Sequence, residues 1–271
     1  MDIADRLMAL SGVTLTLLAT LFTWGMTALG AALVFLLRKG ASQRVMDAML
    51  GFAAGVMVSA SFFSLLMPAI AYAEESGVPP YIPAVTGFLA GCGFLWLCDK
   101  LIPHFHPLND RAEGMHNRFG RTTLLILAVT LHNIPEGLAV GVAIGAAAAS
   151  GDSRGILAGL ALAAGIGIQN FPEGAAVSLP SRKSGKSPLK AWWYGQLSGL
   201  VEVPAALLGV LAVTFIKPLL PYAMAFAAGA MLYVVFDELI PEAHADGRNS
   251  MVTFMAVAGL AVMMLLDIAL G

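Results

Sequence analysis

Long apolar runs, separated by short polar breaks, repeat along the whole chain. Each run has about 20 residues or more, the length that a helix needs to cross roughly 30 Å of hydrocarbon. No break is long enough to hold a soluble domain. The pattern therefore predicts an all-α integral membrane protein, one polytopic domain over residues 1–271. Its eight expected transmembrane helices are 13–37, 47–70, 81–101, 122–149, 154–179, 190–214, 218–241 and 251–270.

The composition excludes an ordinary soluble protein, because 58% of the 271 residues are hydrophobic and only 12% are charged. The stretch before the first run contains acidic residues and no small-residue cleavage site. We therefore expect that run to be a mature helix and not a signal peptide. Cys92 and Cys98 lie in one apolar run, where small apolar packing groups are the expected role.

The distribution of basic residues predicts the orientation in the membrane. Cytoplasmic loops carry an excess of Lys and Arg, and twelve of the fifteen basic residues fall on one side of the expected spans. That side is predicted to be cytoplasmic, which places both termini outside a plasma membrane, the inner membrane of a bacterium. The three basic residues on the other side are Arg6, Arg154 and Lys217.

The longest polar break, at about 102–121, is a histidine-bearing loop on the predicted cytoplasmic side. It contains His104, His106 and His116 among charged residues. Three histidines could bind metal as a sensor, although a flexible loop would hold the ion without much specificity. A metal-sensing role and unspecific metal binding by this loop both stay open.

Two nearly identical motifs lie 37 residues apart in the middle of the fourth and fifth runs. His132–Gly137 reads H-N-I-P-E-G, and Gln169–Gly174 reads Q-N-F-P-E-G. Because the two runs cross the membrane in opposite directions, the motifs are related by a pseudo-twofold axis in the membrane plane. Inverted repeats with interrupted helices that meet near the midplane are the usual layout of a transporter binding site.

Buried carboxylates make these motifs candidates for a cation site. Glu136, Glu173 and Glu202, the last in the sixth run, all lie where no Lys or Arg is expected. An ionisable group at that depth is expensive, so a divalent cation is the simplest partner. Pro135 and Pro172 cannot donate a backbone hydrogen bond, so each frees one carbonyl oxygen beside its motif.

The donor set suggests which ions the site would accept. His132 and Glu136 share one helical face, four residues apart, and Asn133, Gln169 and Asn170 add amide oxygens. Imidazole, carboxylate and amide oxygen suit borderline divalent ions such as Zn²⁺, Fe²⁺ and Mn²⁺, with Cd²⁺ as a mimic. The second run could add the thioether of Met57, although a single methionine among fourteen is usually a packing residue.

Polar residues near the helix ends are candidates for an entrance and an exit. Ser64 and Asp267 lie toward the predicted outer side, and ordinary solvated helix ends are the alternative interpretation. The candidates for the cytoplasmic exit are Asp237, Glu238, Glu242 and His244.

The paired motifs resemble those of the ZIP (Zrt/Irt-like protein) family of divalent metal transporters, and the Q-N-x-P-E-G version resembles its GufA-like branch. The resemblance implies a 3+2+3 helix bundle, a midplane site that holds one or two metals, dimers, and an elevator-like movement of one helix group. Its expected partners are metal ions, the lipid bilayer and a second copy of the chain, with no nucleic acid. By the family pattern the metal is lined by His132, Asn133, Glu136, Gln169, Asn170 and Glu173, with Glu202 and Met57 as further ligands.

We therefore expect a divalent-metal importer that moves Zn²⁺, and also Fe²⁺, Mn²⁺, Co²⁺ or Cd²⁺, into the cytoplasm by alternating access. The metal is the substrate, and no catalytic residue or catalytic cofactor is expected. An intramembrane metalloenzyme that activates water on a metal is the alternative, although the chain has no H-E-x-x-H helix. A proton or cation channel is a third interpretation.

Overall fold

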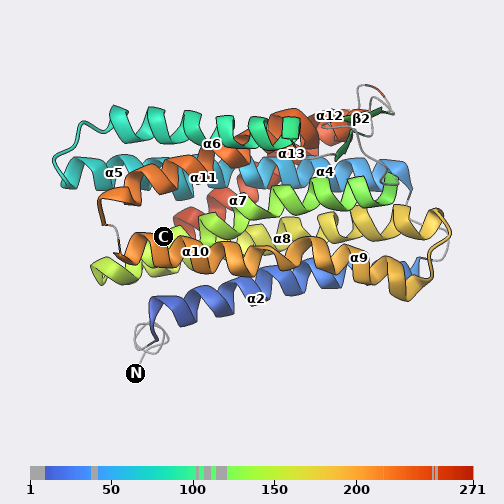
Figure 1. Cartoon of the computed structure of the whole chain (residues 1–271), viewed down its shortest axis with the longest axis horizontal. Coiled ribbons are helices and arrows are strands. Elements are labelled where there is room, and N and C mark those ends of the chain that lie inside the picture. Colours follow the sequence, from blue (N-terminus) through green and yellow to red (C-terminus); the bar gives the residue numbers. More distant parts are fainter. Residues whose placement is uncertain are drawn as a thin grey trace.

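The structure is a computed structural model that describes residues 10–37, 42–101, 104–106, 111–113, 121–215, 217–245, 247 and 250–270. For residues 104–106, 111–113, 121–125, 128 and 217 it describes the backbone. The described chain is a bundle of long, roughly parallel helices (Figure 1). One short antiparallel hairpin, formed by β1 (His104–His106) and β2 (Arg111–Glu113), pairs His104 with Glu113.

The helices follow the predicted apolar runs to within a few residues, and several long ones are divided into segments. The first half of the chain contains α2 (Gly12–Ala31), α3 (Leu33–Leu36), α4 (Gln43–Ser59), η1 (Ala60–Leu66), α5 (Met67–Glu75), α6 (Tyr81–Leu101) and α7 (Arg121–Ser150). The second half contains α8 (Ser153–Lys183), α9 (Pro188–Leu200), α10 (Glu202–Phe215), η2 (Lys217–Leu219), α11 (Leu220–Val234), η3 (Val235–Leu239), α12 (Ile240–Ala243) and α13 (Ser250–Leu270).

The predicted all-helical membrane fold is confirmed. Among the described residues, seven helical stretches are long and apolar enough to cross a membrane. α7, which has 30 residues, lies alongside these stretches and is long enough for an eighth crossing, which supports the predicted count of eight (Figure 1). α2 begins and α13 ends toward the same end of the bundle, as an even number of crossings requires (Figure 1).

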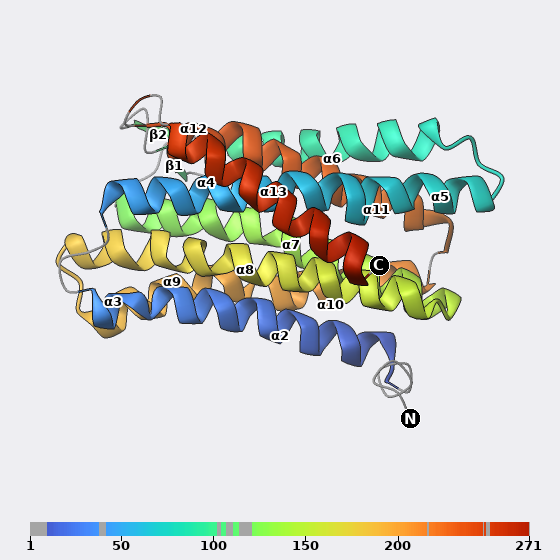
Figure 2. The ribbon, with the colours of Figure 1, turned by 180° about the vertical axis from the view of Figure 1, so that it is seen from behind.

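Two groups of helices make up the bundle. In the first, α7 packs against α10 and α8, and α2 packs against α8, α9 and α10. In the second, α4 packs against α13, and α6 packs against α11. α6 and α11 lie along one side of the bundle and α2 along the other, with α7 and α8 between them (Figures 1 and 2).

Local sequence explains where several helices begin. The side chains of Ser11, Asp152 and Ser187 each accept a hydrogen bond from a backbone N–H in the first turn of α2, α8 and α9, respectively. Gly151 turns the chain between α7 and α8 with φ of 70°, a value that glycine adopts without a steric penalty. This tight turn makes α7 and α8 antiparallel neighbours.

The inverted repeat extends beyond the two motifs. Gly55-x-Met57 in α4 and Gly229-x-Met231 in α11 are each followed by a π-helical segment, η1 or η3. The next α-helix then carries a proline in its first turn in both cases. Gly55 packs against the backbone of α13 and Gly229 against the backbone of α6. The α4–α13 pair therefore matches the α11–α6 pair, as an inverted arrangement of three helices on each side of α7 and α8 requires.

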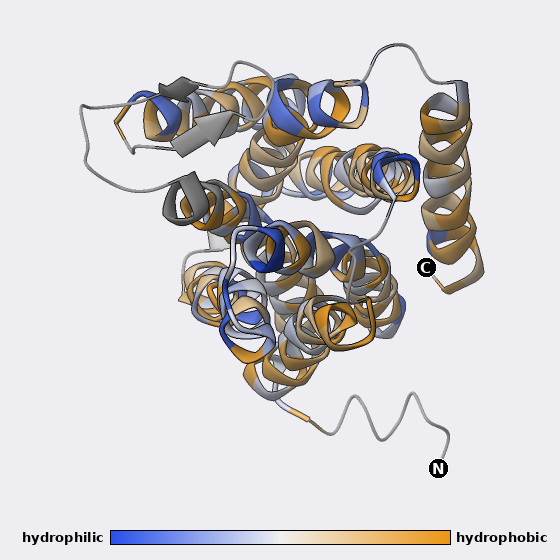
Figure 3. Cartoon of the chain, turned by 90° about the vertical axis from the view of Figure 1, so that its right-hand side faces the viewer, coloured by the Kyte–Doolittle hydropathy of each residue, from blue (hydrophilic) through white to orange (hydrophobic). Residues whose placement is uncertain are grey.

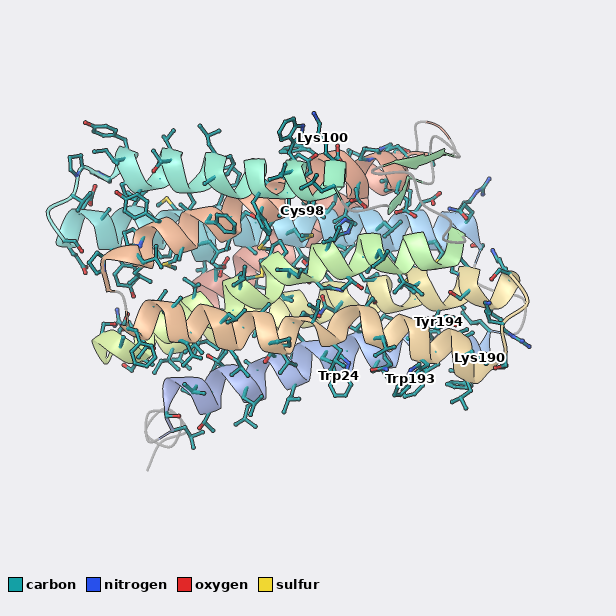
Figure 4. All side chains as sticks on the ribbon, viewed as in Figure 1. Trp24, Cys98, Lys100, Lys190, Trp193 and Tyr194 are labelled. Atoms are coloured by element: carbon teal, nitrogen blue, oxygen red, sulfur yellow. The ribbon has the colours of Figure 1, made fainter. Side chains whose placement is uncertain are left out.

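The outer surface matches a lipid environment. Large hydrophobic side chains are exposed on many of the helices, and the helix that ends at the C-terminus, α13, lies at the edge of the bundle (Figure 3). Phe215 is 80% exposed and Ile268 is 76% exposed, values that would be unfavourable in water. Trp193 and Tyr194 lie one turn from Lys190 on α9 (Figure 4). Such aromatic and basic neighbours are typical of the membrane interface.

Candidate metal site

The antiparallel helices α7 and α8 bring the two motifs together inside the bundle. Both helices continue through their prolines, Pro135 and Pro172. The interrupted helices expected at the midplane are therefore local losses of one backbone hydrogen bond and not breaks. In the sixth span, one residue, Val201, separates α9, which ends at Leu200, from α10, which begins at Glu202. Pro204 causes a local loss of the same kind there, because it cannot donate to the carbonyl of Leu200.

The glycine that ends each motif allows a neighbouring helix to approach closely. A Cβ on Gly137 would lie 2.7 Å from Glu202 Cα on α10, and a Cβ on Gly174 would lie 2.8 Å from Ala31 N on α2. Both distances are too short for a real side chain. The first glycine thus brings Glu202 beside Glu136, and the second brings α2 beside Glu173.

Hydrogen bonds from the three amide groups fix their orientation. Asn133 Nδ2 donates to Ser198 O at 2.9 Å, and Gln169 Nε2 donates to Glu136 Oε1 at 2.7 Å. Asn170 Nδ2 donates to Glu202 Oε1 at 2.7 Å and lies 3.3 Å from Thr23 O. Because each NH₂ group is engaged in this way, each amide oxygen points elsewhere.

Five buried oxygen atoms of the motifs have no hydrogen-bond partner. The residues that carry them are almost inaccessible, since four are 0% exposed and Glu173 is 5% exposed. A buried acceptor without a donor costs about 1–3 kcal/mol, and more if it is charged. A bound cation is one kind of partner that satisfies such acceptors. The five atoms are Asn133 Oδ1, Glu136 Oε2, Gln169 Oε1, Asn170 Oδ1 and Glu173 Oε2.

The charges of the site lie close enough to interact. Glu136 interacts electrostatically with Glu173 and Glu202, and Glu173 interacts with His132. Among the described residues, no three His, Cys, Asp or Glu side chains already converge as a metal site. A metal site between these helices would therefore use the amide oxygens as well as the acids.

His132 is engaged across the boundary between the two helix groups. Its Nε2 is paired with Glu238 Oε1 of η3, one of the residues predicted for the exit. A metal that binds His132 through Nε2 must compete with this carboxylate. Met57 is 0% exposed on α4, a helix that packs against α8.

The other predicted relay residues are placed as follows. Ser64 donates a hydrogen bond of 2.7 Å to Asp267 Oδ1, which joins η1 to α13. Asp237 is half-buried beside Glu238, and Glu242 is half-buried and interacts electrostatically with Glu238 and His132. His244 Nδ1 lies 3.0 Å from Ile240 O in its own helix.

The predicted histidine loop is described only in part. His104 and His106 lie in β1, whose backbone packs against α7. His116 and most of the loop lie outside the described residues. The metal-sensor hypothesis for this loop stays a prediction.

Sequence reasoning missed Thr23 and Asp99. Thr23 donates a hydrogen bond to Glu202 from α2. Asp99 interacts electrostatically with His132. The inverted repeat could have revealed Asp99, because it follows Gly91 by eight residues, as Asp267 follows Gly259.

Known proteins match nearly the whole chain. A family model described as "ZIP Zinc transporter" matches residues 104–267. The zinc transporter ZIP11 of Xenopus tropicalis is 43% identical, over 96% of this chain and 98% of its own length. The chain belongs to the ZIP zinc transporter family. Zinc transporter GufA of Myxococcus xanthus is 37% identical over 94% of this chain, and zinc transporter ZIPB of Bordetella bronchiseptica is 42% identical over 90% of it. These matches cover 98% and 78% of the two relatives.

Membership of the ZIP family confirms the resemblance carried by the paired motifs. The relatives are named as transporters and not as enzymes. The metalloenzyme interpretation therefore has no support.

Proposed function

We propose that this chain carries divalent transition-metal ions across a membrane through the site between α7 and α8. The observation that supports the proposal most strongly is the set of five buried oxygens without a donor. They come from both motifs, and the ion pair described near these acids joins His132 to Glu238 and to none of the three motif or span-six glutamates. A divalent cation supplies the missing positive charge and the missing contacts together.

The donors fit an ion that binds and is then released. Carboxylate and amide oxygens with one imidazole suit Zn²⁺ and other borderline ions. No thiolate is among the candidate ligands, so the tight closed geometry of a structural zinc site is not expected. Zn²⁺ is our first choice of substrate because the relatives are named zinc transporters. Fe²⁺, Mn²⁺, Co²⁺ and Cd²⁺ are the competitors to compare.

The proposed path runs from the side of the chain termini toward the cytoplasm. Ser64 and Asp267 would receive the ion at the outer side, and Glu238 would accept it beyond His132. Asp237, Glu242 and His244 follow on the same side as Glu238. In this scheme both termini lie outside a plasma membrane, as the basic residues predict.

The two helix groups suggest how access could alternate. The described side-chain hydrogen bonds of the site stay within the α2, α7, α8, α9 and α10 group, apart from the His132–Glu238 pair. We infer that this group moves with the ion against the α4, α6, α11 and α13 group, and that the protein works as a dimer. A metal that binds His132 in place of Glu238 would remove one side-chain contact between the two helix groups.

Uptake into proteoliposomes tests the proposal. Purified protein should give saturable Zn²⁺ uptake that Cd²⁺, Co²⁺, Mn²⁺ and Fe²⁺ inhibit to different extents. Glu173→Ala should abolish uptake while the protein still elutes as a folded species, because it removes a charged ligand. If Glu173→Ala takes up metal at the wild-type rate, the transport site does not include Glu173 and the proposed location is wrong. Flux that does not saturate would favour a channel, and metal retained through chelation without flux would favour an enzyme.

A further inference from the structure

The turn between α8 and α9 concentrates positive charge at one end of the bundle. Four basic residues fall within residues 182–190, and the sequence between Glu173 and Glu202 contains no acidic residue. Two of the four are exposed and two are half-buried. Within the part of the chain that the structure describes, no ion pair involves any of them. The four residues are Arg182, Lys183, Lys186 and Lys190.

Backbone hydrogen bonds give this turn a defined shape. Gly185 has φ of 90°, and its N–H donates to Arg182 O at 3.1 Å. The N–H of Lys186 donates to Ser181 O at 3.3 Å, which closes the C-terminus of α8. Arg182 Nη1 also donates to Lys186 O at 2.8 Å. The basic residues therefore lie on a closed turn between two helices.

The charge at the start of α9 has the wrong sign for a helix N-terminus. The first turn of α9 contains no acidic residue, and Lys190 lies within it. A helix N-terminus carries a partial positive charge that acidic groups stabilise and basic groups oppose. An anion beside this turn would compensate the helix end and the basic side chains together.

Exposed apolar residues beside these charges indicate the level of the membrane. Leu189 is 64% exposed and Trp193 is 51% exposed, and they lie one turn apart on the same face of α9. An exposed leucine in this position is favourable in contact with lipid chains and unfavourable in water. Trp193 and Lys190 lie near the same end of α9 (Figure 4), and tryptophan is typical of the membrane interface. The basic residues therefore lie at the level of the lipid headgroups.

The distance along α8 gives the same level. Lys183 follows Glu173 by ten residues of this helix, about 15 Å at 1.5 Å per residue. That length is half the hydrocarbon thickness of roughly 30 Å. Because Glu173 is predicted to lie near the midplane, Lys183 reaches the edge of the hydrocarbon on the predicted cytoplasmic side. The cytoplasmic leaflet is also the one whose surface is negatively charged.

We propose that the α8–α9 turn binds the phosphate group of an anionic phospholipid. The basic side chains contact the phosphate, and the acyl chains lie against Leu189 and Trp193. Inorganic phosphate offers the same charge, but it has no group that would cover the exposed leucine and tryptophan. This surface lies at the end of α8 and α9 and is separate from the metal site, so lipid binding does not depend on which ion is carried.

Thermal unfolding of the full chain in detergent micelles with added lipid tests this proposal. Phosphatidylglycerol should raise the Tm in a saturable way, and zwitterionic phosphatidylcholine should not. Each basic residue near an anionic surface changes binding by about fivefold. Lys186→Gln or Lys190→Gln should therefore raise the phosphatidylglycerol fraction at half-maximal shift about fivefold, and the double variant about 25-fold. Lys190→Arg keeps the charge and should bind as wild type does.

Arg154→Gln is the matched control, since Arg154 is an exposed basic residue at the opposite end of α8, two positions from Asp152. It should leave the lipid response unchanged. Each variant is compared with its own lipid-free Tm, which separates lipid binding from any loss of stability. The proposal is overturned if phosphatidylcholine gives the same shift, if the double variant keeps the wild-type midpoint, or if Arg154→Gln weakens binding equally. An equal shift with inorganic phosphate alone would show a site for a soluble anion and would also overturn it.

Discussion

Replacement of Glu136 by glutamine should stabilise the metal-free protein and remove its response to metal. Glu136 is 0% exposed, its Oε1 accepts from Gln169 at 2.7 Å, and its Oε2 has no donor. A glutamine keeps the acceptor and places an NH₂ group among oxygens that lack donors. It also removes one of three neighbouring negative charges. The substitution therefore eliminates an unfavourable contact at the same position where it eliminates a metal ligand.

The expected magnitudes follow from these contacts. Satisfying one buried acceptor should raise the free energy of unfolding of the metal-free protein by about 1–3 kcal/mol. At roughly 2–4 °C per kcal/mol, its Tm should rise by about 2–12 °C. At an ion concentration of 100 times Kd, metal binding raises the free energy of unfolding of the wild-type protein by about 2.7 kcal/mol. Loss of one partner of a buried charge pair costs about 3–5 kcal/mol, so the variant should show almost no metal-induced shift at that concentration.

Thermal unfolding in detergent, with and without Zn²⁺, measures both effects in one experiment. Asp47→Asn is a matched control, because Asp47 is a buried carboxylate on α4 that accepts from Gln43 at 2.8 Å. It should keep the full shift with metal. The reasoning is refuted if Glu136→Gln retains the wild-type shift, or if its metal-free Tm falls below that of wild type.

Three further predictions follow from the same structure. Gly137→Ala should lower the free energy of unfolding by about 1–3 kcal/mol, because its Cβ would lie 2.7 Å from Glu202 Cα; Gly25→Ala, with nothing within 4 Å of the added atom, should not lower it in the same thermal assay. Asp267→Ala and Glu238→Ala should each reduce the maximal rate of uptake into proteoliposomes, and unchanged half-saturation and maximal rate in both would exclude the proposed relay. Metal affinity should fall as the pH is lowered from about 8 to about 5.5, because protons compete with the metal for the carboxylates and the imidazole; equal affinities across that range would contradict a site built on these ligands.

The spans and the central motifs could be predicted because their signals are strong in the sequence. Apolar runs of sufficient length gave the helix bounds to within a few residues, and the two N-x-P-E-G stretches identified α7 and α8 as the helices of the site. The predicted interruption at Pro135 and Pro172 was wrong, because both helices continue through them. Packing against α2 and α10 holds these segments helical despite the lost backbone bonds.

Residues with ordinary local sequence could not be assigned in the same way. Thr23 is one of several threonines in an apolar run, and its contact with Glu202 depends on how α2 is rotated against α10. The pairing of His132 with Glu238 likewise joins residues 106 positions apart on helices of different groups. Contacts of this kind depend on tertiary packing, which the apolar pattern of a single run does not specify.

The location of the bound ion tests the account most directly. Crystals of the full chain grown with Cd²⁺ or Zn²⁺ should give an anomalous difference peak within coordination distance, about 2.0–2.2 Å for zinc, of Glu136 Oε2 and Glu173 Oε2. At least one of the amide oxygens of Asn133, Gln169 and Asn170 should complete the site. An ion bound elsewhere in the bundle, with no peak between α7 and α8 at saturating metal, would contradict the account.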